Sequence, residues 1–333
     1  MDDEFAFIDS VTPKGTKQHG LVVGIGDDAA MYQATDGFNQ VICVDTMVEG
    51  IHFRKDTLTP YQIGRKVLAI NLSDLAAMGA IPRYFVVSIA VPSTWNEEEL
   101  QEIYLGMKEL ADRYDVDLIG GDTVSTNSGL VLTITTTGEV EQGRMLLRSV
   151  AKPGDIVFLT GEVGVSAAGL DLLNEMGLEG PYTEEEMKLV KIHQEPKPQI
   201  EAGRIFAEIN ERVALNDVSD GVASEVNELA TASQVMIEID AQCLPIQLTT
   251  SYKTREQALE WALFGGEDFQ LIGTTSETTF PKLAQLFEEK GIQLTAIGKV
   301  YEGKPEVWLK DHDKKGKLDR KGYNHFQKGD KNE

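Results

Sequence analysis

Acidic side chains recur in this chain at the ends of apolar segments and inside one of them, where an unneutralised charge is costly. The clearest example is Gly24-Ile25-Gly26-Asp27-Asp28, which follows the apolar run Leu21-Val22-Val23. The two glycines permit a tight turn, which places both carboxylates at its tip. A single turn of this kind is more often a solvated hairpin, so the motif alone leaves both interpretations open.

The same pattern returns along the chain, which favours a shared role. One aspartate ends a predicted strand, one lies in an apolar helix, one follows a glycine pair, and two flank Ser219. Carboxylate oxygens are the ligands that hard divalent cations prefer. We therefore predict one oxygen-rich site for hard cations, to which the Asp27-Asp28 pair, Asp45, Asp74, Asp122, Asp217 and Asp220 contribute.

Each motif also has a structural interpretation. Asp74 could hydrogen-bond the backbone, Gly120-Gly121-Asp122 could be a plain turn, and the segment from Asp217 to Gly221 could cap a helix. Against this, paired glycines let backbone N–H groups approach a phosphate, and a helix N-terminus attracts one. The stretch Gly161–Gly169 resembles a phosphate loop but lacks the Lys-Ser/Thr ending of a Walker A motif.

The composition excludes several classes of protein. The chain has 333 residues, 31 Lys and Arg against 54 Asp and Glu, and a formal charge of −23, which argues against a nucleic-acid binder. Two cysteines imply neither a disulfide framework nor a thiolate zinc site. An acidic N-terminus without an apolar signal segment, and no long apolar run, predict a cytoplasmic protein without membrane contact.

The elements that must position these residues alternate between strands and helices. In the first half we predict an α+β unit with helices on one face of a sheet, in which Asp45 and the Gly120-Gly121 pair end strands. The predicted strands are 21–23, 40–46, 84–91, 116–119 and 130–140, and the predicted helices are 60–78 and 97–114.

The second half is predicted to be an α/β unit that begins after a polar stretch near residues 141–154. We predict two domains, 1–148 and 149–333, and a loose charged tail from Lys310. The predicted helices are 166–175, 198–210, 222–232, 254–262 and 281–290, and the predicted strands are 156–160, 235–239, 269–273 and 292–299.

Seven motifs and an ending, KGYNHF, occur in an order that resembles the thiamine-monophosphate kinase family, within the aminoimidazole ribonucleotide synthetase superfamily. The motifs are GIGDDAA (24–30), VDTMVEGIHF (44–53), NLSDLAAMGAIP (71–82), GGDT (120–123), RSVAKPGD (148–155), DVSDG (217–221) and GGEDF (265–269). The resemblance implies a two-domain fold, with an N-terminal ATP- and Mg²⁺-binding α+β domain whose sheet pairs in a homodimer and a C-terminal α/β domain that completes the active site.

The resemblance also implies ATP-dependent phosphorylation of thiamine monophosphate to thiamine diphosphate, with several Mg²⁺ ions. The implied metal ligands are six aspartates: Asp28, Asp45, Asp74, Asp122, Asp217 and Asp220. Direct in-line transfer would need no catalytic His or Cys. The implied catalytic residues are Asp28, Asp74, Asp122, Asp220 and Arg148. The implied ATP contacts are Gly121, Asp122, Arg148 and Ser219, and the implied contacts to thiamine monophosphate are His52, Glu267 and Tyr323.

One position departs from the family pattern. Where the family often has a Ser or Thr that helps to hold metal, this chain has Cys43, and a thiol is a poor ligand for Mg²⁺. An aminoimidazole ribonucleotide synthetase-like ligase and a non-enzymatic cation-binding protein stay as alternatives. Selenophosphate synthetases and hydrogenase-maturation relatives fit less well, because residues 1–30 and the chain end lack their reactive cysteine.

Overall fold

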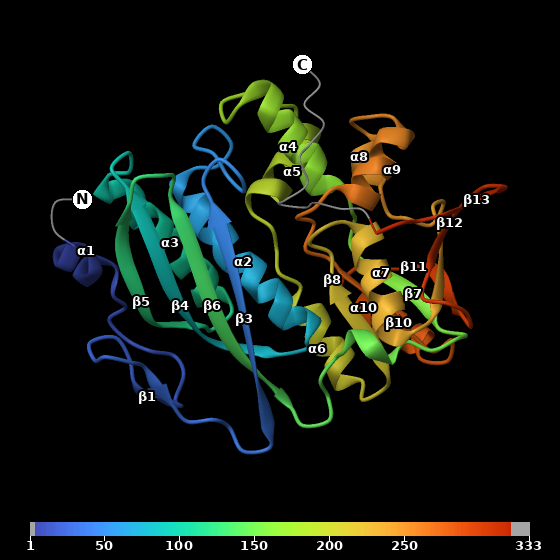
Figure 1. Cartoon of the computed structure of the whole chain (residues 1–333), viewed down its shortest axis with the longest axis horizontal. Coiled ribbons are helices and arrows are strands. Elements are labelled where there is room, and N and C mark those ends of the chain that lie inside the picture. Colours follow the sequence, from blue (N-terminus) through green and yellow to red (C-terminus); the bar gives the residue numbers. More distant parts are fainter. Residues whose placement is uncertain (1–3, 321–333) are drawn as a thin grey trace. The chain divides into compact units, whose positions relative to one another are not determined.

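The computed structural model describes residues 4–320, and the chain divides by its internal contacts into two compact units. Unit 1 comprises Met1–Leu147 and Gly169–Glu211, and unit 2 comprises Arg148–Ala168 and Arg212–Glu333. Figure 1 shows both units in ribbon form. The units resemble the predicted domains, 1–148 and 149–333, except that the segment Gly169–Glu211 groups with unit 1. The domain boundary itself stays a prediction.

Unit 1 contains a four-stranded sheet in the order β3-β6-β4-β5. Neighbouring strands run antiparallel except for β4 and β5, which are parallel and are connected through a helix. The strands are β3 (Phe38–Val48), β4 (Ile81–Pro92), β5 (Asp117–Thr126) and β6 (Val131–Glu141).

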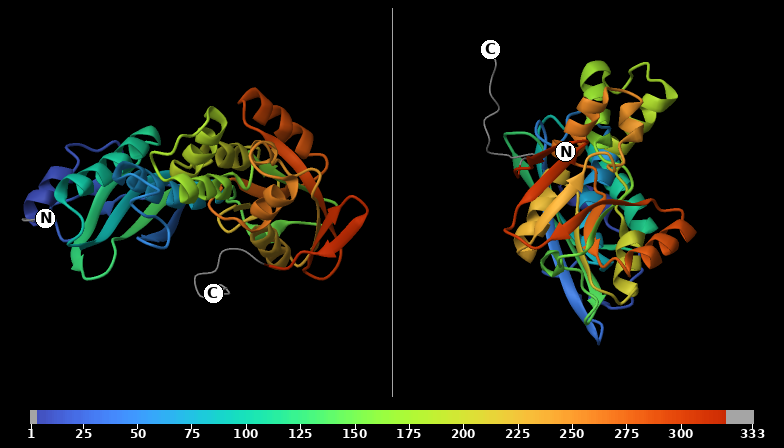
Figure 2. Two further views of the ribbon diagram at one scale, coloured as in Figure 1. Left: turned by 90° about the horizontal axis from the view of Figure 1, so that it is seen from above. Right: turned by 90° about the vertical axis from the view of Figure 1, so that its right-hand side faces the viewer.

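Two helices, α2 (Pro60–Ala77) and α3 (Glu97–Arg113), cover one face of this sheet (Figures 1 and 2). The sequence predicts both helices and their single-face placement. Thr59 and Gln62 form a capping box at the start of α2, where Pro60 suits the first helical position. The two helices cross closely, because a Cβ at Gly64 would overlap the carbonyl oxygen of Ile103.

The remaining elements of unit 1 lie around this two-layer core. A short hairpin, β1 with β2, precedes the sheet, and two later helices pack on α2. Their bounds are α1 (Glu4–Val11), β1 (Leu21–Val23), β2 (Met31–Tyr32), α5 (Glu184–Gln194) and α6 (Ile200–Glu208). The helix α4 (Val165–Met176) begins in unit 2 and ends in unit 1.

Unit 2 contains a seven-stranded sheet in the order β13-β12-β9-β11-β7-β10-β8. The pair β12–β9 is parallel and the other neighbours are antiparallel. The strands are β7 (Ile156–Thr160), β8 (Val213–Asp217), β9 (Met236–Asp240), β10 (Leu271–Thr275), β11 (Leu294–Tyr301), β12 (Val307–Asp311) and β13 (Lys314–Lys317).

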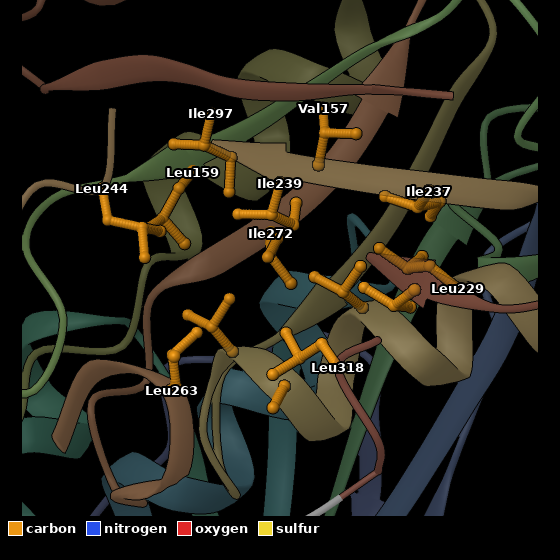
Figure 3. Packing of buried hydrophobic residues seen from close by; sticks show 14 of the residues in the cluster. Val157, Leu159, Leu229, Ile237, Ile239, Leu244, Leu263, Ile272, Ile297 and Leu318 are labelled. Atoms are coloured by element: carbon orange, nitrogen blue, oxygen red, sulfur yellow. The ribbon is translucent and has the colours of Figure 1, made fainter. Parts of the chain in front are cut away.

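The core of unit 2 lies between one face of this sheet and the helices α7 (Val222–Ser233) and α9 (Arg255–Phe264). Strand residues such as Val157 and Ile272 pack there against Leu229 and Leu263 of the helices (Figure 3). The remaining helices of unit 2 are η1 (Arg148–Val150), α8 (Gln247–Thr250) and α10 (Phe280–Glu289).

Two predicted strand ends are wrong. Asp45 lies inside β3 and Asp122 inside β5, since each strand continues for several residues beyond the aspartate. Hydrogen-bonded pairing continues through both positions, and glycine is accepted in β5 because the neighbouring strand leaves no room for a side chain.

The expectation of a loose tail from Lys310 is also wrong for the described residues, because β12 and β13 form an antiparallel pair there. The exposed lysines of β13 form salt bridges such as that of Lys315 with Glu238 of β9 at 2.5 Å, which compensate part of their positive charge. The helix α5 was not predicted either, although a capping box of Thr183 and Glu186 marks its start.

Candidate active site

The loop that carries Asp28 and the strand that carries Asp122 line an open cavity in unit 1. The loop connects β1 to β2, and Gly26 within it has a φ of +115°, which glycine adopts without strain. The cavity has a volume of about 360 Å³. Its polar lining includes Asp27, Asp28, Asp122, Ser88, Thr133 and Thr135. The GIGDD and GGD motifs, nearly a hundred residues apart in sequence, therefore meet in one place.

A row of short polar side chains leads across the sheet to Asp122. In the strand register Thr46 pairs with Thr133, Thr133 with Ser88, and Ser88 with Asp122. Side chains at paired positions point to the same face of a sheet, and this is the face that α2 and α3 leave uncovered. The hydroxyls of Thr46 and Thr133 lie 2.9 Å apart. These hydroxyls are functional candidates that the sequence motifs do not reveal.

Gly121 is required by close packing. A Cβ at this position would overlap the carbonyl oxygen of Val87 on the neighbouring strand. The glycine lets β5 pass close to β4 and leaves its own backbone exposed at the cavity. An exposed glycine backbone beside a carboxylate is suited to a phosphate group that also binds a cation.

A second acidic pair, Asp45 and Asp74, lies on the opposite face, toward α2. Asn71, which is fully buried in α2, accepts a hydrogen bond from the backbone N–H of Asp45 at 3.1 Å. Its amide nitrogen donates to the carbonyl oxygen of Val67 at 2.9 Å. Asn71 therefore ties β3 to the helix turn that carries Asp74, and both carboxylates lie near the thiol of Cys43.

Cys43 is held as a neutral thiol. Its sulfur lies 2.8 Å from the hydroxyl of Thr136 and donates to the carbonyl oxygen of Asn71 at 3.4 Å. Burial raises the pKa of the Cys43 thiol far above its usual value, and the carboxylates of Asp74 and Asp45 raise it further. A thiol that stays protonated and hydrogen-bonded is not a ligand for a hard cation.

His52, the predicted substrate contact in unit 1, sits in a short loop after β3. Its Nδ1 accepts the backbone N–H of Val48 at 3.0 Å, so the ring proton of the neutral form lies on Nε2. The loop is held by Glu49, whose carboxylate accepts from the indole of Trp95 at 3.0 Å and from the backbone of Leu130 at 2.8 Å. The structure thus fixes the orientation of the imidazole.

In unit 2 the DVSDG and GGEDF motifs lie side by side. The backbone N–H of Glu267 donates to the carbonyl oxygen of Ser219 at 2.7 Å, and that of Phe269 donates to Val218 at 2.8 Å. Glu267 and Phe269 have φ values of +70° and +48°, which are strained for residues with side chains. Strained backbone of this kind clusters at functional sites.

The residue between them, Asp268, fixes this strained loop. Its buried carboxylate accepts the backbone N–H groups of Gly164 at 2.6 Å and of Ser166 at 3.0 Å, at the start of α4. Burial raises the pKa of Asp268 to about 7, although these hydrogen bonds act in the opposite direction. Asp268 therefore holds Glu267 in place and does not itself face solvent.

A further buried carboxylate, Glu225, lies beside Asp217 and Asp220, and none of the sequence motifs includes it. Burial and the nearby charge of Asp217 raise the pKa of Glu225, whereas the hydrogen bond from the backbone of Asp220 lowers it. Its carboxylate accepts the backbone N–H of Asp220 at 3.1 Å and the side-chain amide of Asn216 at 2.5 Å. The signal that could have revealed Glu225 is its place in the first turn of the helix that follows DVSDG.

Arg148 is anchored at the first residue of unit 2. Its Nε donates to Oδ1 of Asn216 at 2.8 Å, and its Nη1 lies 2.9 Å from the carboxylate of Glu228. About half of the side chain is exposed. An anchored and exposed guanidinium is suited to binding a phosphate.

The family comparisons identify the protein class. The N-terminal domain of AIR synthase related proteins matches residues 26–140, and the C-terminal domain of the same proteins matches residues 152–310. Thiamine-monophosphate kinase of Bacillus subtilis (strain 168) is 50% identical over 98% of this chain and 100% of its own length. The chain belongs to the thiamine-monophosphate kinase family.

Solved structures of this family have the same fold as this chain. The crystal structure of thiamine-monophosphate kinase from Stenotrophomonas maltophilia K279a has a TM-score of 0.83, with 32% identity over 93% of this chain and 96% of that chain. A structure of AaThiL complexed with AMPPCP and TMP has a TM-score of 0.73, with 29% identity over 91% of this chain and 92% of that chain. The expected fold and family resemblance are confirmed.

The six aspartates of the thiamine-monophosphate kinase motifs are divided between the two units. Within residues 4–320, no three His, Cys, Asp or Glu side chains are arranged to hold a metal ion. In unit 1 they form two pairs, Asp28 with Asp122 and Asp45 with Asp74, and in unit 2 Asp217 and Asp220 flank Ser219. Tyr323 lies outside the described residues. None of the described helices is long and apolar enough to cross a bilayer.

Proposed function

We propose that this chain catalyses the ATP-dependent phosphorylation of thiamine monophosphate to thiamine diphosphate, with Mg²⁺ bound to its paired aspartates. The observation that carries this proposal is the 50% identity to a thiamine-monophosphate kinase over nearly the whole chain. Membership in a kinase family favours an enzyme over a cation-binding protein, and it favours phosphoryl transfer over a ligase reaction.

The donor groups fit Mg²⁺. Mg²⁺ is usually held by one or two carboxylates and completes its octahedral shell with water and substrate phosphates, rather than by a dedicated protein cage. Pairs of aspartates are what the described residues offer. The assigned ligands are Asp28, Asp45, Asp74, Asp122, Asp217 and Asp220. The bound ions would neutralise the phosphates and align the two reacting groups.

The other residues of the chain bind and orient the two anionic substrates. We assign the nucleotide phosphates to Arg148, Ser219 and the backbone around Gly121, because an anchored guanidinium and exposed glycine backbone suit phosphate oxygens. We assign thiamine monophosphate to His52, Glu267 and Tyr323. The accepting group is already an ionised phosphate, so direct in-line transfer needs no general base and no phosphorylated residue.

A homodimer and a cytoplasmic location are part of the proposal. Ile42, Val44 and Val124 on the uncovered sheet face of unit 1 are 70%, 58% and 46% exposed, more than an apolar face normally leaves to water. Pairing of this face with a second copy would bury them. The cytoplasm supplies the ATP that the reaction consumes.

A coupled assay of ADP release tests the function. Purified protein is incubated with ATP, with and without Mg²⁺, and with thiamine, thiamine monophosphate or aminoimidazole ribonucleotide precursors. ADP release that depends on both Mg²⁺ and thiamine monophosphate is the expected result. ADP release with an aminoimidazole precursor instead would favour the ligase alternative.

A further inference from the structure

A continuous chain of hydrogen bonds joins Arg148 to Asp220 through two buried side chains of unit 2. Arg148 Nε donates to Asn216 Oδ1 at 2.8 Å, and Asn216 Nδ2 donates to Glu225 Oε2 at 2.5 Å. The other carboxylate oxygen, Oε1, accepts the backbone N–H of Asp220 at 3.1 Å. Three separate elements, η1, β8 and α7, meet in this chain.

Because these hydrogen bonds are buried, each donor and acceptor depends on its protein partner. Asn216 is 0% exposed and Glu225 is 3% exposed, so water cannot replace a lost partner cheaply. The amide of Asn216 has one orientation that satisfies both neighbours, because its oxygen must face the guanidinium and its nitrogen must face the carboxylate. A network in which each member has a fixed donor or acceptor role holds its ends in defined positions.

A second carboxylate beside this network, that of Glu228, forms a salt bridge with Arg148. It lies 2.9 Å from Arg148 Nη1 and also binds Arg320 at 2.5 Å. It approaches Asn216 Nδ2 only at 3.4 Å. The backbone N–H of Asp220 is bound by Glu225, so the link from the guanidinium to Asp220 runs through Asn216 and Glu225.

We infer that Asn216 and Glu225 are positioning residues that place Arg148 and Asp220 as one unit toward the metal-bound nucleotide. The inference rests on the proposed function, which assigns Arg148 to ATP and Asp220 to Mg²⁺. Neither Asn216 nor Glu225 touches substrate in this scheme. They act by fixing the backbone of Asp220 relative to the guanidinium of Arg148.

The chemistry of the chain provides a reciprocal test. In Glu225→Gln the new amide can accept from Asp220, but its nitrogen then faces the nitrogen of Asn216. If Asn216 turns over to relieve this, its nitrogen faces Arg148 instead, so one bond is lost in either orientation. The double variant combines Asn216→Asp with Glu225→Gln. Its new carboxylate at position 216 accepts from both Arg148 and the new amide, and the oxygen of that amide still accepts from Asp220.

The experiment measures KM for ATP and for thiamine monophosphate, and separately titrates Mg²⁺–AMPPCP binding by calorimetry. We expect Glu225→Gln to weaken ATP and AMPPCP binding about tenfold, the effect of one buried hydrogen bond. KM for thiamine monophosphate should change by less than about twofold, because the scheme assigns this network to the nucleotide. The double variant should recover part of the loss, because its new carboxylate restores the bond but also lies near the carboxylate of Glu228. Glu139→Gln is the matched control, since it neutralises another buried carboxylate, paired with Arg83 in unit 1.

The outcomes separate this inference from the proposed function. Arg148→Ala with unchanged AMPPCP binding would remove the assigned role of Arg148, and the positioning role with it. Weakened binding in Arg148→Ala but not in Glu225→Gln would overturn the positioning role alone. Failure of the double variant to recover binding, while circular dichroism shows that it is folded, would overturn it as well.

Discussion

At the scale of single residues, the surroundings of each carboxylate decide what it can do. Asp28 and Asp122 face a cavity. The carboxylate of Asp268 accepts hydrogen bonds from backbone N–H groups, and that of Glu225 accepts from a side-chain amide and a backbone N–H. The same side-chain type therefore serves as a candidate ligand in one place and as a structural support in another. The sequence motifs predict where the candidate ligands lie. The supporting residues Asn216 and Glu225 are not predictable, because their role depends on contacts between distant segments.

The Asp74→Asn substitution tests the metal role of the second acidic pair. Asparagine keeps the size of the side chain and is tolerated in the helix, but it removes the charge. We expect a folded protein whose turnover falls by about a hundredfold or more, the scale of losing one preorganised electrostatic group. Raising the Mg²⁺ concentration should recover only part of the lost turnover. Steady-state kinetics over a Mg²⁺ series is the measurement, and near-normal activity at low Mg²⁺ would remove Asp74 from the metal site.

The Cys43→Ser substitution tests the one departure from the family pattern. The thiol is buried and bonded to Thr136 and Asn71, and a hydroxyl can make the same contacts. Oxygen is also the better ligand for Mg²⁺. We expect unchanged activity or a lower Mg²⁺ concentration for half-maximal rate. A folded variant without activity would mean that the thiol has a role of its own.

At the scale of elements, glycine positions set how closely the helices of unit 1 pack. A Cβ at Gly64 would overlap Ile103, and a Cβ at Gly106 would overlap the carbonyl oxygen of Tyr61. The backbones of α2 and α3 therefore touch directly. Asn71 and Asp74 are carried on α2, so this contact also determines where they meet β3.

The Gly106→Ala substitution measures this contact. Alanine gains about 1 kcal/mol of helix propensity, whereas overpacking a closed interface costs about 1–3 kcal/mol. We expect a net loss of stability in urea unfolding, because the obstructing atom is backbone and cannot rotate away. The matched control is Gly15→Ala, where a Cβ has nothing within 4 Å. Equal stability of the two variants would show that α2 and α3 can separate freely.

Asp268 gives a pH dependence at the start of α4. Its folded pKa of about 7 lies above the ordinary 3.8, so the folded state binds a proton that the unfolded state releases. This contribution is present below about pH 4 and is lost as the pH rises toward about 7, with a slope of roughly 1.4 kcal/mol per pH unit. We expect Asp268→Asn to flatten the pH dependence of unfolding across this interval. Asp36→Asn, on the exposed surface, should leave it unchanged.

Element prediction succeeds where apolar spacing is strong and fails where pairing supplies the stability. Helices α2 and α3 follow from their periodicity and caps. Strand β13, Lys314–Lys317, has no apolar side chain and forms because β12 lies beside it. The sequence also does not predict that β5 continues through Asp122. A glycine pair normally marks a strand end, and here pairing with β4 carries the strand past it.

At the scale of the whole molecule, the net charge of −23 makes the binding of anionic substrates unfavourable unless cations are present. Two phosphate-bearing substrates approach an acidic protein, so cations must lie between them. This predicts which acceptor is used. Free thiamine lacks the phosphate that would recruit Mg²⁺, and its alcohol would end too far from the γ-phosphorus.

We therefore expect stoichiometric ADP and thiamine diphosphate from thiamine monophosphate, and at most weak inhibition by thiamine. A displacement of about 1 Å can already cost about a hundredfold in rate, so a missing phosphate should cost more. Product analysis by chromatography with both compounds is the measurement. Comparable turnover of thiamine, or a ³²P-labelled protein after incubation with γ-labelled ATP alone, would contradict direct transfer.

The division of the chain into units has a consequence for its synthesis. Unit 1 is interrupted by Arg148–Ala168 and resumes at Gly169–Glu211, so neither unit is one continuous stretch. Domains commonly fold in order as they leave the ribosome. Here the nascent chain must extend to Glu211 before α5 and α6 can pack on α2, and by then β7 has emerged without the strands that flank it. Unit 1 is therefore complete only when Glu211 has emerged, unit 2 needs the strands that follow, and no single cut releases either unit intact.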